Sequence, residues 1–503
     1  MGGMTSKGPV DLSGMDRRFF EALSPDARVE LLCRLHALAI EQAEKLARDS
    51  TNSSRPPSSD SPFGRSFGSP TGTVPPSPLP LASPPATAPE PPLGSGRKAG
   101  KQRGSKGIWR CEALQAERDE NHFPTHCAAC ATPFEMWDRQ IGHSAHFVLD
   151  LERTAGGIRI ACVRHRYHAI ECACGVRTAA RPGVGMLSTV PGRSRDLLLS
   201  EACLVGPALA TFIAALSVRY HVSRAKIREF LAVWFGVPLS VGTLDRCIRE
   251  VGVACEPVVE DLLGDLRQAG VIHADETPWK QHGRLRWLWV VLSSSTAIFH
   301  IGSRQGDEIR DLIGDAFLGW LVSDGYGAYR KFKKRQRCLA HLIRKGIALA
   351  GGLNPQGAYF GAWLLREVRG LIHEVAEGTS ARIINPILAR LKRACKRHRD
   401  DEAEKVRALA REVLNDWAAI TAFVTNPDLP ATNNEAERAL RDAVIARRIS
   451  NGTRSEEGSA AYAATLSVFE TCRRRGVDPW RYITDLLARA CKGLPHLAIP
   501  LEA

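Results

Sequence analysis

The pattern of apolar and polar residues begins with a helical segment near the start of the chain. Within residues 24–48, apolar side chains recur every three or four positions, as in an amphipathic helix: Leu31, Leu35, Leu38, Ala39, Ala43 and Leu46. Ser24 is placed to cap this helix, and Pro25 suits its first position. The apolar stripe fits two structures, a short coiled-coil dimerisation segment or a helix packed on its own domain.

Short apolar runs further along the chain are typical of strands. They fall at residues 271–274, 285–292, 296–301 and 320–323. Adjacent antiparallel strands, followed by a helix over about residues 305–314 and another strand, predict a mixed α/β sheet. Helical periodicity returns over residues 356–425, around Glu437, and from Gly458 to Cys472.

Residues 190–266 are also expected to be helical, and they contain a helix–turn–helix pattern. Ser223 and Ser240 are good N-caps, and Gly236 can end the first of the two helices. One interpretation places the second helix in the major groove of DNA. The other is a packed helical connector.

Composition changes the picture between residues 49 and 107. Thirteen prolines fall between Pro56 and Pro92, so this stretch is expected to be a disordered linker. The linker ends in basic residues for which contact with DNA phosphates is the favoured interpretation and a solvated tail is the alternative: Lys98, Lys101, Arg103 and Lys106. The net charge of +14 over 503 residues is consistent with a polyanionic partner.

Two close pairs of cysteines predict a structural zinc site within a module spanning residues 108–185: Cys127 with Cys130, and Cys172 with Cys174. Four buried free thiols are the alternative. Residues 147–152 and 158–164, which lie between the pairs, alternate like strands. Cys162, His165 and His168 are further possible ligands, for which ordinary packing is the simpler interpretation.

Three acidic residues stand in settings typical of a metal-dependent active site: Asp275, Asp324 and Glu437. Each aspartate ends an expected strand, and the glutamate lies in an expected helix. Carboxylates are the ligands that Mg²⁺ or Mn²⁺ prefers, and a pair of such ions cuts or joins phosphodiester bonds. Glu276 is not expected to join them because strand neighbours point to opposite faces. Glu435 lies about 200° around the helix from Glu437.

Two further features near these acids have two readings each. Arg438 and Arg441 follow Glu437 closely and either contact phosphate near the site or are exposed helix charges. Cys338 and His341 have the spacing of a metal-binding pair, but two ligands are missing, so a packed strand-to-helix corner is the preferred interpretation.

The motifs resemble those of DDE-type transposases of the insertion sequence sixty-six family, over most of the chain. The resemblance rests on residues 53–60, the paired cysteines, the tail from Gly476, and four short blocks: His273-Ala274-Asp275-Glu276-Thr277-Pro278, Ser323-Asp324-Gly325-Tyr326, Cys338 to Lys345, and Asn433-Asn434 with Ala436-Glu437-Arg438. It implies a ribonuclease-H-like core in which Asp275, Asp324 and Glu437 are catalytic. Residues 447–452 depart from the family's usual block after the glutamate.

The resemblance also implies the activity and the partners. These are binding of terminal inverted repeats, cleavage of 3′ ends and transfer to target DNA, often beside small accessory proteins of the same element. A homo-oligomer is expected because two DNA ends must be held together. The alternatives are a domesticated, non-catalytic DNA-binding protein and a ribonuclease-H-like nuclease that cuts without joining.

The sequence therefore predicts a multidomain α+β protein with structural zinc and catalytic magnesium or manganese. No signal segment and no apolar run of about 20 residues is recognised, so a cytoplasmic, nucleoid-associated protein without membrane contact is expected. Six segments are expected: a helical segment 1–48, a linker 49–107, a zinc module 108–185, a helical region 190–266, a catalytic domain 267–475 with a helical insertion 350–425, and a tail 476–503.

Overall fold

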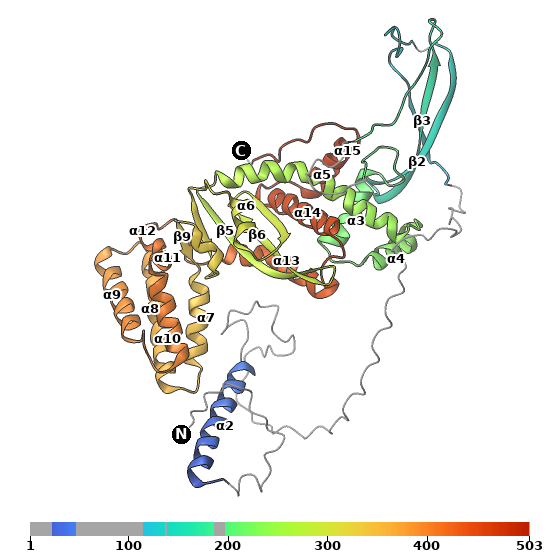
Figure 1. The fold of residues 1–503 in the computed structure, drawn as a ribbon. Helices are drawn as coiled ribbons and strands as arrows, with labels where there is room; N and C mark the ends of the chain where they lie inside the picture. The colour runs from blue at the N-terminus through green and yellow to red at the C-terminus, as the bar shows by residue number, and fades with distance from the viewer. Residues whose placement is uncertain (1–22, 47–113, 136–137, 186–196, 502–503) are drawn as a thin grey trace. The chain divides into compact units, whose positions relative to one another are not determined.

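A computed structural model describes residues 23–46, 114–135, 138–185 and 197–501 (Figure 1). The expected linker, with Lys98, Lys101, Arg103 and Lys106, lies outside the described residues. The chain divides into two compact units. One comprises Ser61–Arg181 with Ala202–Leu204, and the other comprises Met1–Asp60, Pro182–Glu201 and Val205–Ala503. The six finer segments stay a prediction.

The expected N-terminal helix is present as α2 (Pro25–Leu46). Ser24 caps it, because the backbone N–H of Ala27 donates to Ser24 Oγ at 3.3 Å. Val29 and Leu32 are each 60% exposed on this helix. A coiled-coil dimer stays a prediction.

The smaller unit contains a long antiparallel hairpin, β2 (Gln140–Thr154) and β3 (Gly157–Glu171). Short strands flank β3: β1 (Arg118–His122) runs parallel to it, and β4 (Arg177–Ala179) runs antiparallel. The hairpin strands are longer than the sequence pattern indicated, because their outer residues are mostly polar. This sheet is mixed.

The larger unit is built around a five-stranded sheet with the order β7-β6-β5-β8-β9. β5 pairs antiparallel with β6 and parallel with β8. The strands are β5 (Val271–Gln281), β6 (Arg284–Leu292), β7 (Ala297–Gly302), β8 (Trp320–Ser323) and β9 (Arg335–Arg337). The expected mixed α/β sheet is therefore confirmed. The helix α6 (Gly306–Ile313) precedes β8, as the sequence predicts.

Three helices lead to this sheet: α3 (Pro207–Val218), α4 (Arg224–Phe235) and α5 (Val241–Arg267). The expected caps are present, with Ser223 accepting from the N–H of Lys226 and Ser240 accepting from that of Thr243. Gly236 ends α4 with a φ of 66°, a left-handed conformation that glycine adopts without strain.

A helical insertion follows β9, close to the range that the sequence predicts. It consists of α7 (Leu339–Ala350), α8 (Pro355–Ala376), α9 (Ala381–Arg397), α10 (Glu404–Asn415), α11 (Trp417–Ile420) and α12 (Ala422–Thr425). Its helices share one apolar core that includes Phe360, Leu391 and Val413. Asp416 joins the insertion to the sheet through ion pairs with Arg335 (2.8 Å) and Arg337 (3.1 Å).

Helices α13 (Asn434–Ser450), α14 (Glu456–Arg474) and α15 (Pro479–Cys491) complete the unit. α13 contacts β5, while α14 contacts β7 and α5. A short 3₁₀ turn, η2 (Gly327–Lys331), connects β8 to β9. Among the described helices, none is both long and apolar enough to cross a bilayer.

Candidate active site and metal-binding residues

Asp275 and Asp324 lie on neighbouring strands of the central sheet. Asp324 directly follows β8, as the sequence predicts, but Asp275 lies within β5, so the expectation that it ends a strand is wrong. β5 and β8 are parallel, with His273 opposite Val322, and each aspartate follows its paired residue by two positions. A backbone N–H orients each carboxylate. Glu276 donates to Asp275 Oδ1 at 2.9 Å, and Tyr326 donates to Asp324 Oδ1 at 2.8 Å.

Asn433 positions the start of α13, and so Glu437, beside β5 and its Asp275. Its side-chain amide donates to the carbonyl of Ala274 at 2.8 Å, and its Oδ1 lies 2.9 Å from His273 Nδ1. Its backbone N–H contacts Cys338 Sγ at 3.1 Å. Asn433 is 1% exposed, so these bonds take the place of hydrogen bonds to water. Glu437 follows one turn later, with its N–H on the carbonyl of Asn433.

Neighbouring acids act electrostatically on Asp275. Burial raises the pKa of Asp275 well above its usual range, and the charges of Glu276, Asp324 and Glu437 raise it further. Like charges gathered around a buried carboxyl are costly unless a cation balances them. The arrangement therefore suits a cation-binding site.

Glu437 is held on one side only. Arg344 on α7 donates to its Oε2 at 2.8 Å, whereas its Oε1 is buried and accepts no hydrogen bond. His341 Nδ1, also buried without a partner, lies 4.0 Å from that oxygen. Burial lowers the pKa of His341, and so does the charge of Arg344. A neutral imidazole and a free carboxylate oxygen thus face each other.

Cys338, His341 and Glu437 are a group whose ligand atoms all lie within 4.8 Å of one another. The sequence interpretation of Cys338 as part of a packed corner holds for its thiol, which is buried against Asn433. His341 and Arg344 were not chosen as site residues from the sequence. Their spacing of three places both on one face of α7, but nothing in that spacing indicates that this face lies against Glu437.

Asp275, Asp324 and Glu437 do not form such a tight group within the described residues. A single magnesium ion would need its oxygen ligands within roughly 4.2 Å of one another, twice the usual metal–oxygen distance. A wider spread of carboxylates suits two ions, which lie about 3.5–4 Å apart in two-metal sites.

Glu276 and Glu435, the acids set aside from the sequence, have other partners. Glu276 accepts from the hydroxyl of Tyr329 at 2.7 Å and pairs with Arg304 at 3.0 Å. Glu435 pairs with Arg438 at 3.2 Å and with Arg474 at 3.5 Å. Both carboxylates are therefore already balanced by neighbouring donors.

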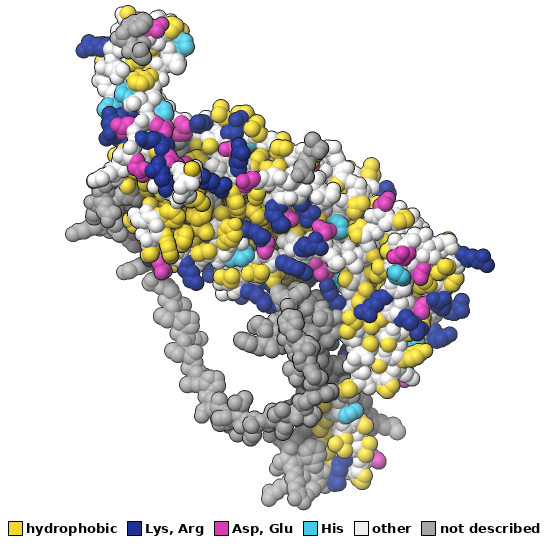
Figure 2. All heavy atoms as spheres, turned by 180° about the vertical axis from the view of Figure 1, so that it is seen from behind, with side chains coloured by type: hydrophobic (Ala, Val, Ile, Leu, Met, Phe, Trp, Pro, Cys, Tyr) yellow, Lys and Arg dark blue, Asp and Glu magenta, His cyan; other side chains and the backbone are white. Residues whose placement is uncertain are grey.

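The arginines of α13 have different surroundings. Arg438 is 67% exposed beside Glu435, and Arg441 is exposed as well. Arg447, in the block that departs from the family pattern, instead anchors α13 to β5 through Thr277 Oγ1 (2.9 Å) and the carbonyl of Pro278 (2.6 Å). In Figure 2, Lys and Arg side chains are interspersed with Asp and Glu over the drawn face.

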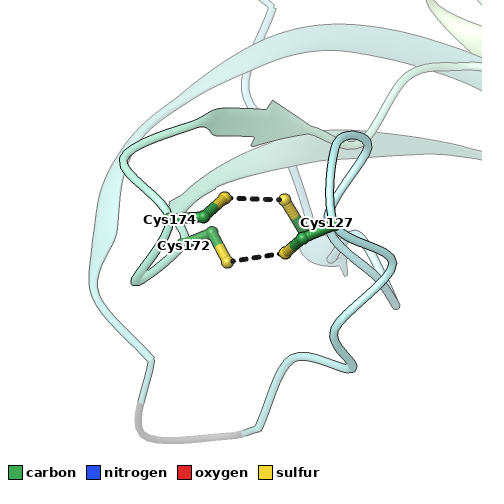
Figure 3. Close-up of side chains that lie close together, drawn as sticks. Cys127, Cys172 and Cys174 are labelled. Carbon is green, nitrogen blue, oxygen red and sulfur yellow. Dashed lines mark hydrogen bonds between the residues drawn. The ribbon is translucent and has the colours of Figure 1, made fainter.

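The four cysteines of the predicted zinc site come together in the smaller unit (Figure 3). Cys127 Sγ lies 3.6 Å from Cys174 Sγ, and Cys130 Sγ lies 3.5 Å from Cys172 Sγ. Tetrahedral zinc with Zn–S bonds of about 2.3 Å separates its sulfurs by roughly 3.8 Å. The four sulfurs therefore fit zinc if each of these two pairs moves apart slightly.

Without a cation, the thiols of this cluster differ in pKa. The backbone N–H groups of Cys130 and Ala129 lower the pKa of Cys127 to about 6. The N–H of Cys174 lowers the pKa of Cys172, but burial and the neighbouring sulfurs outweigh it and raise that pKa to about 12. Four thiolates cannot share this space without a balancing charge, which a metal ion supplies.

The three further candidate metal ligands in this unit have different surroundings. Cys162 is buried within β3, and His168 bonds to Asn121 (2.8 Å), so packing accounts for both. His165 instead lies with Glu120 and His122 in a group whose ligand atoms are within 4.8 Å of one another. The sequence interpretation as ordinary packing is thus incomplete for His165.

Comparison with known sequences covers the larger part of the chain. Residues 202–461 match the model of a family described as "Transposase IS66 family", where IS66 denotes insertion sequence sixty-six. Uncharacterized protein y4jD of Sinorhizobium fredii is 23% identical over 406 residues, which cover 73% of this chain and 75% of that protein. Uncharacterized protein y4jO of the same organism is 25% identical over 338 residues, 65% of this chain and 87% of that protein.

Proposed function

Because the chain belongs to the IS66 transposase family, we propose that it binds the terminal inverted repeats of its element, cleaves their 3′ ends and joins them to target DNA. The observation that carries this proposal is that Asp275 within β5 and Asp324 directly after β8 lie on neighbouring strands, with α13 bringing Glu437 beside them.

In this proposal Asp275, Asp324 and Glu437 hold two magnesium or manganese ions. When bound, such ions activate the attacking oxygen and stabilise the leaving oxygen. The unpartnered Glu437 Oε1 and the crowding of charge around Asp275 support a cation here. Arg344 fixes the other oxygen of Glu437, and Asn433 fixes the helix that carries it.

The remaining parts of the chain are proposed to bind and hold DNA. Structural zinc at the four cysteines would stabilise the smaller unit. The basic residues of the linker, with Arg438 and Arg441, would contact phosphates. A homo-oligomer would hold two ends together, and accessory proteins of the element would act beside it.

Incubation of the full chain with end-sequence DNA, a target plasmid and Mg²⁺ tests this function. The wild type should yield joined products. Glu437→Gln should reduce joining by about 100-fold or more, because misplacing reacting groups by ~1 Å already has an effect of that size. Glu435→Gln is the matched control and should keep most activity, since its carboxylate pairs with arginines.

The outcomes separate the alternatives. Cleavage without joining would identify a nuclease, and binding to end DNA without cleavage would identify a non-catalytic DNA-binding protein. Full activity of Glu437→Gln, with end binding and thermal unfolding unchanged, would contradict the assigned triad.

A further inference from the structure

We propose that Glu120, His122 and His165 form a second metal site in the smaller unit, for a zinc-class divalent ion, separate from the four cysteines. The pairing of the strands brings these residues together. In the parallel pairing of β1 with β3, Glu120 lies opposite His165 and His122 lies opposite Tyr167. Residues two apart on a strand share a face, so all of these side chains lie on the same face of the sheet.

The distances fit a shared ion. His122 Nε2 lies 2.9 Å from His165 Nδ1, and Glu120 Oε2 lies 3.6 Å from the same Nδ1. Tetrahedral zinc, with bonds of about 2.1 Å to nitrogen and oxygen, separates its ligand atoms by roughly 3.4 Å. The two observed distances lie on either side of that value. A small rotation of the rings would therefore admit the ion.

The surroundings hold these ligands in place. Arg118 contacts Glu120 Oε1 at 3.3 Å, which leaves Oε2 to face the histidines. The ring of Tyr167, which is 4% exposed, stacks on His122 with centroids 4.5 Å apart. Ligands fixed by neighbouring groups bind metals more tightly than free ones.

The site has three protein ligands, and a tetrahedral ion takes a fourth. His146 on β2 lies opposite His165, with ring centroids 5.5 Å apart, so it is the nearest candidate for the fourth position. A water molecule would fill that position otherwise. Two imidazoles with a carboxylate suit zinc and related transition metals better than magnesium.

This site is distinct from the cysteine cluster. His165 and Cys172 are seven residues apart along β3 and its end, which corresponds to about 23 Å of extended chain. One ion cannot serve both sets. An ion at Glu120, His122 and His165 would bind β1, a strand of five residues, to the hairpin.

Zinc titration of the full-length protein after chelation tests the site. We expect two zinc ions per chain in the wild type and one in His165→Ala. Cobalt substitution identifies the ion that remains, because only a cysteine site gives thiolate-to-cobalt charge-transfer absorption. That absorption should persist in His165→Ala and disappear in Cys127→Ser.

His143→Ala is the matched control, since this exposed histidine on β2 lies on the opposite face from His165 and should leave two ions bound. Glu120→Gln keeps the side-chain shape and should lower the affinity for one of the two ions by about 10-fold or more. One zinc per chain in the wild type, or two ions with unchanged affinity in both Glu120→Gln and His165→Ala, would overturn the proposal.

Discussion

At the residue scale, the clustered acids of the candidate active site destabilise the metal-free protein. Asp275 is surrounded by three other carboxylates, and burial already disfavours its charge. Arg344 balances only one oxygen of Glu437. Such an arrangement favours metal binding over stability of the metal-free protein.

Asp275→Asn should therefore raise the thermal stability of the metal-free protein while abolishing strand transfer. The folded-state pKa of Asp275 is raised above its unfolded value, so folding loses stability as pH rises above about 4. Removal of the titrating group should raise Tm by roughly 2 °C or more at pH 8 in EDTA, and less at pH 4.

Thermal unfolding with and without Mg²⁺ measures this effect. Mg²⁺ should stabilise the wild type more than Asp275→Asn, because the variant lacks a ligand. Asp428→Asn, at an exposed position, is the control and should change little. An Asp275→Asn protein that unfolds at or below the wild-type Tm in EDTA at pH 8 would show that the carboxylate is not destabilising.

The choice of Asp275 over Glu276 and of Glu437 over Glu435 stays a prediction: Glu435 pairs with arginines, whereas Glu276 pairs with Arg304 and also acts electrostatically on Asp275. Residue patterns did not predict Arg344 or His341 beside Glu437. Arg344 is 93 positions from Glu437 in the sequence, and His341 is further away. Local periodicity cannot predict a contact between residues so far apart in the sequence.

At the element scale, strongly patterned segments were predictable and polar ones were not. The strands β5, β6, β7 and β8 and the caps of α4 and α5 follow from apolar runs and from Ser and Gly positions. β9 was not predicted, because its three residues are Arg335, Gln336 and Arg337. Gln336 is fully buried and accepts from the N–H of Phe423, which a hydrophobic pattern cannot show.

The packing of α5 on α14 depends on one glycine. A methyl group at Gly252 would lie 2.4 Å from both Cα and Cβ of Ala461, so Gly252→Ala should push the helices apart and destabilise the protein by about 1–3 kcal/mol. Gly264 on the same helix has open space, so Gly264→Ala should stabilise it by roughly 0.5–1 kcal/mol.

Urea unfolding of the two variants beside the wild type gives the comparison. Opposite signs of the change in unfolding free energy are expected from the same substitution on one helix. Equal stability of Gly252→Ala and Gly264→Ala would mean that α5 and α14 do not approach as closely as described.

At the scale of the whole molecule, the two compact units have different sources of stability. The larger unit has an extensive apolar core, whereas the described residues of the smaller unit form a four-stranded sheet with the cysteine cluster. Small domains with limited cores commonly depend on a metal ion.

Loss of the zinc proposed for the cysteine cluster should therefore unfold the smaller unit alone. In Cys127→Ser, amide hydrogen exchange should accelerate over residues 118–179 and stay slow in the central sheet over residues 271–337. Cys33→Ser, at an exposed cysteine of α2, is the control. Unchanged protection of the hairpin in Cys127→Ser would show that the smaller unit folds without an intact cysteine cluster.

By itself, the sequence determined the types of element, the mixed α/β sheet, the paired cysteines and the membership of the IS66 transposase family. These depend on short-range periodicity and on motifs of a few residues. Only the tertiary structure decided which side chains meet: Asp275 with Asp324, Asn433 with β5, Arg344 with Glu437, and His122 with His165. Those contacts join residues from 43 to 160 positions apart, and chain topology, rather than local preference, brings them together.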